Sequence, residues 1–171
     1  LVARPLGLSL PQLRSMPMRT QITRHDCVEG WSAIGKWHGV PLGTVLDAAG
    51  MSTRARFVVF HCMDRFGDVP YYESIDLVDA FHPQTILAWG MNGKPLETIH
   101  GFPLRLVIGG WPASLSTKWL KRIWIRDRVH DGPGMGGMSY GVPIRPMEPG
   151  EPADESTFRD LESMPVRSIL T

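Results

Sequence analysis

The stretch that sets the class of fold is residues 100–111, which read HGFPLRLVIGGW. Its centre, residues 104–108, is an apolar run rich in leucine and branched side chains, which is typical of a buried strand. Gly-Phe-Pro before the run and Gly-Gly-Trp after it favour loops, because proline fixes φ and glycine tolerates positive φ. The stretch therefore predicts a core strand between two loops, with the polar His100 and Arg105 near its start.

Short elements extend from this strand in both directions. The spacing and the turn residues predict strands over 18–28, 56–62, 71–75, 85–91 and 123–127, helices over 9–17 and 41–50, and helical turns over 74–81 and 116–121. Gly50 is expected to close the second helix, and Asn92-Gly93 is expected to form a turn. The pattern predicts a mixed α+β fold with short elements and long loops.

The character of the chain changes after residue 130. Residues 130–153 are rich in glycine, proline and methionine and show little periodicity, so neither a long helix nor a central strand is expected there. We expect an extended arm over 131–171, following a domain over 1–130, and the start of a further strand at 166–170.

Composition excludes several classes of protein. The 171 residues suit one domain, and 43% apolar with 20% charged residues is typical of a globular chain. A net charge of +1 does not favour a nucleic-acid partner, and no apolar run is long enough to cross a membrane. Two cysteines are too few for a disulfide framework.

Cys27 is the first candidate for chemistry. It stands where a predicted strand ends, close to Arg24 and His25, which favour the thiolate form of a reactive or ligating cysteine. A buried, unreactive thiol and a Cys–His nucleophile pair remain open alternatives. A zinc site built from His25, Cys27, His61 and Cys62 is disfavoured, because no CxxC or HxxxH spacing occurs and His61 and Cys62 would face opposite sides of a strand.

A second group of polar residues flanks the central strand. It comprises His100, Arg105, Ser116, Thr117 and Lys118, whose charges and hydroxyls suit a phosphate group. Neither a GxGxxG nor a P-loop pattern is present, so a Rossmann or P-loop nucleotide site is not supported. Ordinary surface charge beside a core strand is the alternative.

Tyr71 is a candidate hydrogen-bond donor to an oxyanion, although most tyrosines only contribute packing.

Taken together, the sequence resembles the molybdenum-cofactor domain of the sulfite oxidase superfamily. The resemblance rests on five ordered blocks, CVEGWS at 27–32, YYESIDL at 71–77, FHPQTILAWGMNGKPL at 81–96, HGFPLRLVIGGW at 100–111 and STKWLKRIWIRD at 116–127. The segments at 134–150 and 164–170 are similar to the arm of the sulfite oxidases and to the start of their β-sandwich dimerisation domain. The resemblance implies a partial molybdopterin-binding fold that lacks an upstream cofactor-binding segment and that dimerises through a missing C-terminal domain.

The resemblance also implies roles for individual residues. Cys27 matches the family cysteine whose thiolate binds molybdenum, and a soft anionic sulfur suits such a metal. Tyr71 matches the active-site tyrosine that faces the metal and the substrate. Residues that match cofactor-binding positions are Cys62, His100, Arg105, Ser116, Thr117 and Lys118, with Arg105 expected on the phosphate.

The implied activity is a two-electron oxygen-atom transfer on a small sulfur substrate, with molybdenum–molybdopterin as cofactor. Oxidation of sulfite to sulfate is the leading expectation, with electrons passing to an external carrier such as a c-type cytochrome. The alternatives are a periplasmic reductase of methionine sulfoxide or of other S- or N-oxides, and a truncated module that only binds. The resemblance places the protein in the periplasm, although the chain itself carries no signal peptide.

One position departs from the sulfite oxidase pattern. Sulfite oxidases usually carry an arginine a few residues after the ligand cysteine, whereas Trp31 and Ser32 stand there in this chain. CVEGWS is closer to the methionine-sulfoxide reductase branch, while the KWL block and the arm are closer to the sulfite oxidase branch. If sulfite is the substrate, Arg24, Lys36, Arg65 or a segment outside this sequence is expected to supply the missing positive charge.

Overall fold

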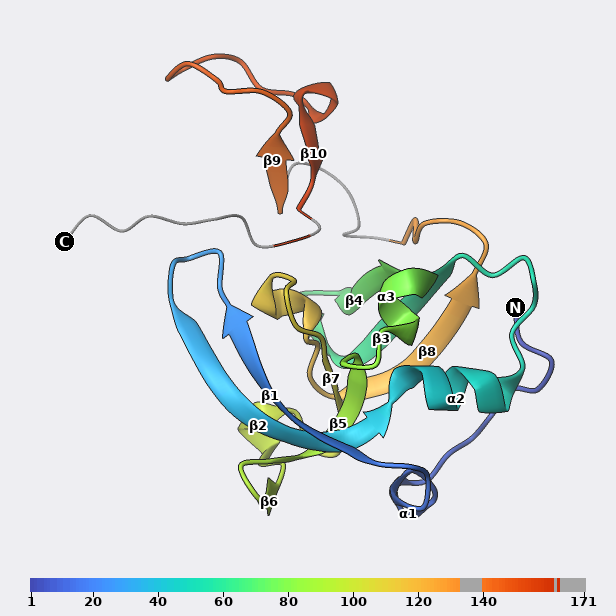
Figure 1. Ribbon diagram of the computed structural model, residues 1–171. Helices are drawn as coiled ribbons and strands as arrows, with labels where there is room; N and C mark the ends of the chain where they lie inside the picture. The colour runs from blue at the N-terminus through green and yellow to red at the C-terminus, as the bar shows by residue number, and fades with distance from the viewer. Residues whose placement is uncertain (133–139, 162, 164–171) are drawn as a thin grey trace.

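The computed structural model describes residues 1–132, 140–161 and 163, and its elements alternate between short helices and strands (Figure 1). In chain order they are α1 (Leu10–Arg14), β1 (Arg19–Asp26), β2 (Ser32–Pro41), α2 (Leu42–Ala49), β3 (Phe57–Phe66), β4 (Val69–Asp76), α3 (Leu77–Phe81), β5 (Ile86–Met91), β6 (Lys94–Pro95), η1 (Thr98–His100), β7 (Arg105–Val107), η2 (Ala113–Leu115), β8 (Leu120–Arg126), β9 (Gly141–Pro143), η3 (Glu155–Thr157) and β10 (Phe158–Asp160), where η marks a 3-10 helix. The mixed α+β class expected from the sequence is confirmed.

Two sheets make up the body of the fold. A five-stranded sheet runs in the order β1-β2-β5-β6, with β7 also paired to β5, and a three-stranded sheet has the order β4-β3-β8. All the strand pairs in these sheets are antiparallel. Figure 1 shows β1 and β2 as a long curved hairpin on one side of the molecule, with α2 at the far end of β2.

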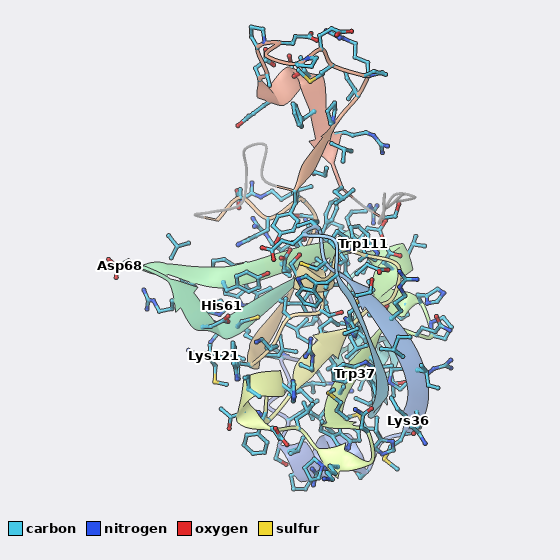
Figure 2. All side chains as sticks on the ribbon, turned by 90° about the vertical axis from the view of Figure 1, so that its left-hand side faces the viewer. Lys36, Trp37, His61, Asp68, Trp111 and Lys121 are labelled. Atoms are coloured by element: carbon cyan, nitrogen blue, oxygen red, sulfur yellow. The ribbon has the colours of Figure 1, made fainter. Side chains whose placement is uncertain are left out.

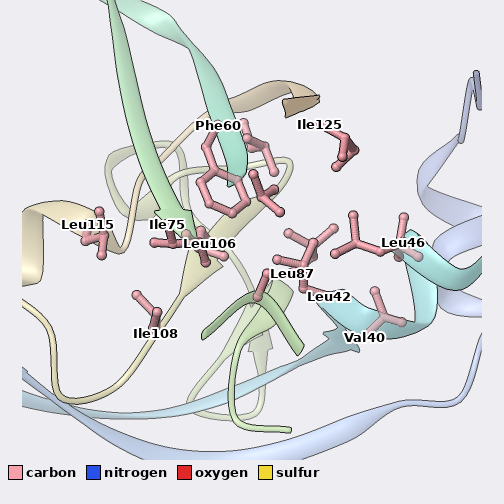
Figure 3. Packing of buried hydrophobic residues seen from close by; sticks show 14 of the residues in the cluster. Val40, Leu42, Leu46, Phe60, Ile75, Leu87, Leu106, Ile108, Leu115 and Ile125 are labelled. Carbon is pink, nitrogen blue, oxygen red and sulfur yellow. The ribbon is translucent and has the colours of Figure 1, made fainter. Parts of the chain in front are cut away.

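The main core lies where the two sheets and α2 meet (Figure 3). Leu87 and Leu106 from the first sheet, Phe60 and Ile75 from the second, and Leu42 from α2 are almost completely buried in one cluster. A smaller cluster that includes Trp37, Ile86 and Val107 forms on the opposite face of the five-stranded sheet. Both faces of this sheet are therefore covered, so the central strands are apolar on both sides, as residues 104–108 predicted.

The helix boundaries follow their capping residues. Ser9 precedes α1, and its backbone N–H donates to Gln12 Oε1 at 2.8 Å. Asp76 caps α3 by accepting from the Asp79 backbone N–H at 2.9 Å. Gly50 ends α2 with φ of 68°, and Asn92-Gly93 turns between β5 and β6 with positive φ at both residues. The helix end at Gly50 and the turn at Asn92-Gly93 confirm the predictions made for them from the sequence.

Two features of the body differ from the prediction. The strand β2 was not expected, because Gly35 and Gly39 interrupt its alternation and Ile34 points to solvent. The helical turn expected over 116–121 is wrong: the turn lies earlier, at η2, and β8 begins at Leu120. The reason is that residues 117–120 extend alongside β7, where Leu106 N–H donates to Thr117 O and Leu120 N–H donates to Leu104 O.

Beyond the body, residues 140–161 form a separate small hairpin, seen at the top of Figure 1. The strands β9 and β10 pair antiparallel over three residues each, and Arg145 forms an ion pair with Glu151 in the connection. Part of the expected arm is thus a hairpin rather than irregular chain. The strand expected at 166–170 lies outside the described residues. No helix in the described ranges is long and apolar enough to cross a bilayer.

Candidate functional site

The site begins at the tip of the β1–β2 hairpin. Cys27 follows the last residue of β1 and is half-buried, and its backbone N–H donates to Trp31 O at 2.9 Å. Gly30 has φ of 102°, a conformation that favours glycine, and its N–H donates to Cys27 O. The tight turn therefore fixes the backbone on either side of the thiol.

Asp26 organises the base of this tip. Its carboxylate forms an ion pair with Arg24 at 2.8 Å and also accepts from the Ser32 hydroxyl. Asp26 further forms a parallel bridge to Pro112, which lies in the connection between β7 and β8. Cys27 is thereby brought next to that connection, although 85 positions separate Cys27 from Pro112 in the sequence.

Arg105 lies buried at the centre of the site. Its guanidinium is stacked 4.7 Å from the centre of the Trp37 ring and donates to His100 O at 2.9 Å and Ser116 O at 2.6 Å. A longer contact joins Nε to Leu106 O at 3.4 Å. Burial lowers the pKa of Arg105 to about 10, so the group stays cationic at neutral pH. Arg105 ties two loops together and retains two further N–H donors.

His25 lies on the inner face of β1, against the edge of the Trp37 ring, with 5.3 Å between ring centres. Burial, and then the charge of Arg105, lower the pKa of His25 to about 4, so the imidazole is neutral at pH 7. Among the described residues, neither His25 Nε2 nor Trp37 Nε1 has a hydrogen-bond partner, although both are buried. Unpartnered buried donors are costly, and at a cluster like this one they are expected to face a polar ligand.

The segment after η2 carries the other polar candidates. Ser116 Oγ is buried and bonds to the backbone of Ile108, so it fixes the loop rather than facing outward. The Thr117 hydroxyl is buried without a nitrogen or oxygen partner in the described part of the chain, and it lies against the Cys62 thiol. Burial raises the pKa of Cys62 to about 12, so this thiol is neutral and unsuited to bind a metal as a thiolate.

Lys118 and Trp119 join this segment to η1. The Lys118 ammonium donates to Ile99 O at 3.2 Å and lies 4.4 Å from the centre of the Trp119 ring, while Trp119 Nε1 donates to Thr98 O at 2.8 Å. Trp119 has φ of 50°, a left-handed conformation that is uncommon for a large residue. Such strain concentrates at functional sites, where the surrounding contacts hold it in place.

Tyr71 faces the same connection from β4. Its hydroxyl donates to Glu73 Oε1 at 2.7 Å and lies 3.2 Å from Ser114 O. Burial and the nearby Glu73 raise the pKa of Tyr71 above its usual value, so the hydroxyl keeps its proton. Glu73 was not singled out in the sequence, although a strand brings residues two positions apart to one face.

The zinc site that the sequence disfavoured is not formed among the described residues. His61 stacks on Trp124, whereas Cys62 lies against Thr117. Figure 2 shows His61 on the three-stranded sheet and Trp37, the neighbour of His25, on the other sheet. Within residues 1–132, 140–161 and 163, no three His, Cys, Asp or Glu side chains gather as a metal site, and both cysteines are free thiols. The zinc alternative therefore has no support from the described residues.

Of the three cations proposed for an anionic substrate, two are paired elsewhere and the third lies away from the site. Arg24 is paired with Asp26, and Arg65 donates to Asp68 O in the turn between β3 and β4. Lys36 lies opposite Ile22 in the hairpin register, and Figure 2 shows it well away from Trp111, the neighbour of Pro112.

The donor set fits a molybdopterin cofactor. A half-buried thiol at a fixed turn suits the metal, and the cationic Arg105 and Lys118 suit the phosphate. The unpartnered buried groups of His25, Trp37 and Thr117 are available to the polar edge of a pterin. Trp37, Trp119 and Glu73 are the site residues that the sequence interpretation missed.

Comparisons with known proteins agree with this donor set. The family model described as "Oxidoreductase molybdopterin binding domain" matches residues 1–133. The protein YedZ1 of Azospira oryzae, named as a subunit of protein-methionine-sulfoxide reductase, is 45% identical over 132 residues, which cover 77% of this chain and 48% of YedZ1. The MsrP catalytic subunit of protein-methionine-sulfoxide reductase from Xanthomonas campestris is 40% identical over 116 residues, covering 61% of this chain and 36% of MsrP.

A solved structure shows the same fold. The sulfane dehydrogenase SoxCD from Paracoccus pantotrophus superposes with a TM-score of 0.75 at 23% identity, over 84% of this chain and 40% of that chain. The chain thus spans about half or less of the length of these relatives.

Proposed function

This chain belongs to the oxidoreductase molybdopterin-binding domain family, and from that premise we propose that it forms the cofactor-binding part of a sulfoxide reductase. The proposed substrate is methionine sulfoxide within proteins. Support comes from relatives named as protein-methionine-sulfoxide reductases at 45% and 40% identity. The proposal therefore adopts sulfoxide reduction, which was an alternative in the sequence analysis. The named relatives do not favour sulfite oxidation, which was the leading expectation.

The observation that carries the proposal is the character of the loop after Cys27. Val28 and Trp31 are 48% and 57% exposed, Glu29 is exposed and acidic, and the nearest arginine is neutralised by Asp26. A sulfite anion would approach a loop surface that is acidic at Glu29 and apolar at Val28 and Trp31. Repulsion by the acidic group disfavours its binding. A neutral sulfoxide carries no charge to repel, and exposed apolar side chains beside a site suit contact with a protein substrate.

In this proposal, different residues of the chain bind the metal, the phosphate, the pterin and the substrate. Cys27 holds the metal, Arg105 and Lys118 hold the phosphate, and Cys62, His100, Ser116 and Thr117 shape the loops around the pterin. Tyr71 donates a hydrogen bond toward the substrate oxygen. The bound cofactor would supply the two-electron oxygen-atom transfer itself.

The overall reaction must balance in electrons and protons. A sulfoxide takes up two electrons and two protons and yields a thioether and water. The electrons would come from a separate electron-carrying protein such as a c-type cytochrome, which agrees with MsrP relatives being named catalytic subunits. A periplasmic location, and an arm that leads to a β-sandwich dimerisation domain, remain proposals of the same kind.

The test uses the full-length protein with its cofactor. Chemically reduced enzyme is mixed with methionine sulfoxide, free or in an oxidised protein, and oxidised enzyme is mixed with sulfite and ferricyanide. We expect rapid reoxidation by the sulfoxide and little reduction by sulfite. Faster turnover with sulfite would overturn the proposal, and a preparation without molybdenum at the stoichiometry of the chain would indicate a binding module.

A further inference from the structure

Tyr71 and Glu73 form a dyad on the inner face of β4. Ile75, the next residue on that face, is buried in the core, so the strand directs this row toward the interior. Glu73 lies opposite Phe60 of β3, a completely buried aromatic side chain. A carboxyl group in such apolar surroundings is unexpected unless another group compensates for its lost hydration.

The Tyr71 hydroxyl has one proton but two acceptors within reach. Glu73 Oε1 lies 2.7 Å away and Ser114 O lies 3.2 Å away. When Glu73 is ionised, it accepts the proton of Tyr71, because a charged acceptor is the stronger one. When Glu73 is protonated, it donates to the Tyr71 oxygen instead, and the Tyr71 proton is free to turn toward Ser114 O.

The surroundings of Glu73 shift its proton equilibrium toward the protonated form. Burial raises the pKa of Glu73 above its usual range, and the hydrogen bond from Tyr71 offsets only part of that rise. In the described part of the chain, two titratable groups from neighbouring elements act on the dyad. They are Cys62 on β3 and Tyr140 just before β9. Asp64 in turn helps to raise the pKa of Cys62. Cys62 is neutral because its pKa is raised to about 12.

The second acceptor places the dyad beside the candidate cofactor site. Ser114 belongs to η2, between Pro112, which bridges the residue before Cys27, and the segment that holds Ser116 and Lys118. A Tyr71 proton that turns away from Glu73 therefore points toward the connection that lines the site.

Resting on the proposed function, we propose that Glu73 is a positioning residue that controls the direction of the Tyr71 hydrogen bond. With Glu73 protonated, the Tyr71 proton points toward Ser114 O on the side of the site, where a substrate oxygen would replace that carbonyl as acceptor. With Glu73 ionised, Tyr71 donates its proton to the Glu73 carboxylate and cannot donate a hydrogen bond to the substrate.

The decisive variant is Glu73→Gln, because a glutamine amide donates to Tyr71 at every pH and mimics the protonated acid. In the native holoenzyme we expect kcat for sulfoxide reduction to fall roughly tenfold as pH rises through the range where Glu73 ionises, which corresponds to the loss of one hydrogen bond. Glu73→Gln should remove this fall, while Glu148→Gln, at an exposed carboxyl in the β9–β10 hairpin, should keep it. Tyr71→Phe should be slow at low pH and at high pH alike.

A second measurement does not depend on turnover. Because Glu73 binds its proton more tightly when folded, its contribution to stability is present below pH 4.5 and is lost as pH rises toward its raised folded pKa. In urea unfolding, the free energy of unfolding of the native protein should therefore fall as pH rises through this range. The free energy of unfolding of the Glu73→Gln variant should not show this fall. Infrared spectra of the native protein should show a protonated carboxyl band that persists to a higher pH than is usual for a glutamic acid and that the variant lacks.

The outcomes separate the two proposals. Absence of sulfoxide turnover in every variant would remove the proposed function, yet the stability slope and the infrared band would still report on Glu73. A native protein and a Glu73→Gln variant with the same pH profile of kcat, or with the same slope of stability against pH, would overturn the role of Glu73.

Discussion

Cys27 depends on its turn for any role in binding a metal. The hydrogen bond from its N–H to Trp31 O and the positive φ of Gly30 hold the thiol at the hairpin tip, and the Asp26–Pro112 bridge brings it to the β7–β8 connection. Cys62 differs in every respect that matters: it is buried within β3 and its thiol is neutral. The two cysteines of the chain therefore lie in different chemical environments.

Cys27→Ser should lose activity and molybdenum while the fold is retained, because a serine hydroxyl is a harder ligand that stays protonated at neutral pH. Metal analysis and circular dichroism of the purified protein check this. Cys62→Ser is the matched control and should keep its molybdenum. A Cys27→Ser protein with the native metal content would contradict the assignment.

Lys118→Ala should weaken retention of the pterin through the loss of a charge-assisted hydrogen bond, by about 1.5–3 kcal/mol. Pterin fluorescence after extended dialysis measures the effect. Lys121→Ala removes an equal charge from an exposed position on β8 and should leave retention unchanged. Equal losses in both variants would mean that net charge matters and the position of Lys118 does not.

At the scale of elements, β2 holds the site together. It pairs with β1, which ends at Asp26 just before Cys27, and with β5 at the centre of the sheet. Its register shifts between His38 and Gly39, where the backbone passes so close to β5 that an added Cβ at Gly39 would lie 2.1 Å from Leu87 O. Only glycine fits this close approach. Because Gly39 also interrupts the alternation of apolar and polar residues, the sequence pattern did not predict the strand.

Gly39→Ala should therefore destabilise the fold by about 1–3 kcal/mol or more, because backbone atoms must move to accept the methyl group. Urea denaturation measures the change in the free energy of unfolding. Gly7→Ala, where an added Cβ has no neighbour within 4 Å, should change stability by less than about 0.5 kcal/mol. A Gly39→Ala protein as stable as the native one would contradict the close approach.

At the scale of the whole molecule, one core joins the two sheets and supports the site at its edge. Leu106 is completely buried in that core, and its neighbour Arg105 points the other way, toward Trp37 and the candidate site. A single strand, β7, thus contributes to the core with one side chain and to the site with the next.

Leu106→Ala should cost about 2–5 kcal/mol of stability through lost burial and the cavity left behind. Ile22→Ala, at a side chain 73% exposed on β1, should cost little. Urea denaturation of both variants measures the difference, and a small cost at Leu106 would place the core elsewhere. Because the core supports the site, Leu106→Ala should also lower cofactor retention at elevated temperature.

The sequence by itself determined those features that depend on neighbouring residues. The apolar run at 104–108, a strand that ends close to Cys27, the close of the second helix at Gly50 and the turn at Asn92-Gly93 were all predicted, since propensity, capping and turn chemistry act over a few residues. The resemblance also predicted the cofactor family correctly.

Only the tertiary structure decided which groups meet. The contact of Tyr71 on β4 with Ser114 in η2 and the stacking of Arg105 on Trp37 join residues from different elements. The neutral state of Cys62 likewise follows from its burial in the folded chain. Their chemistry comes from burial and from contacts across the chain. A local pattern carries no information about either, because hydration is lost and charges come close only when the sheets close around the core.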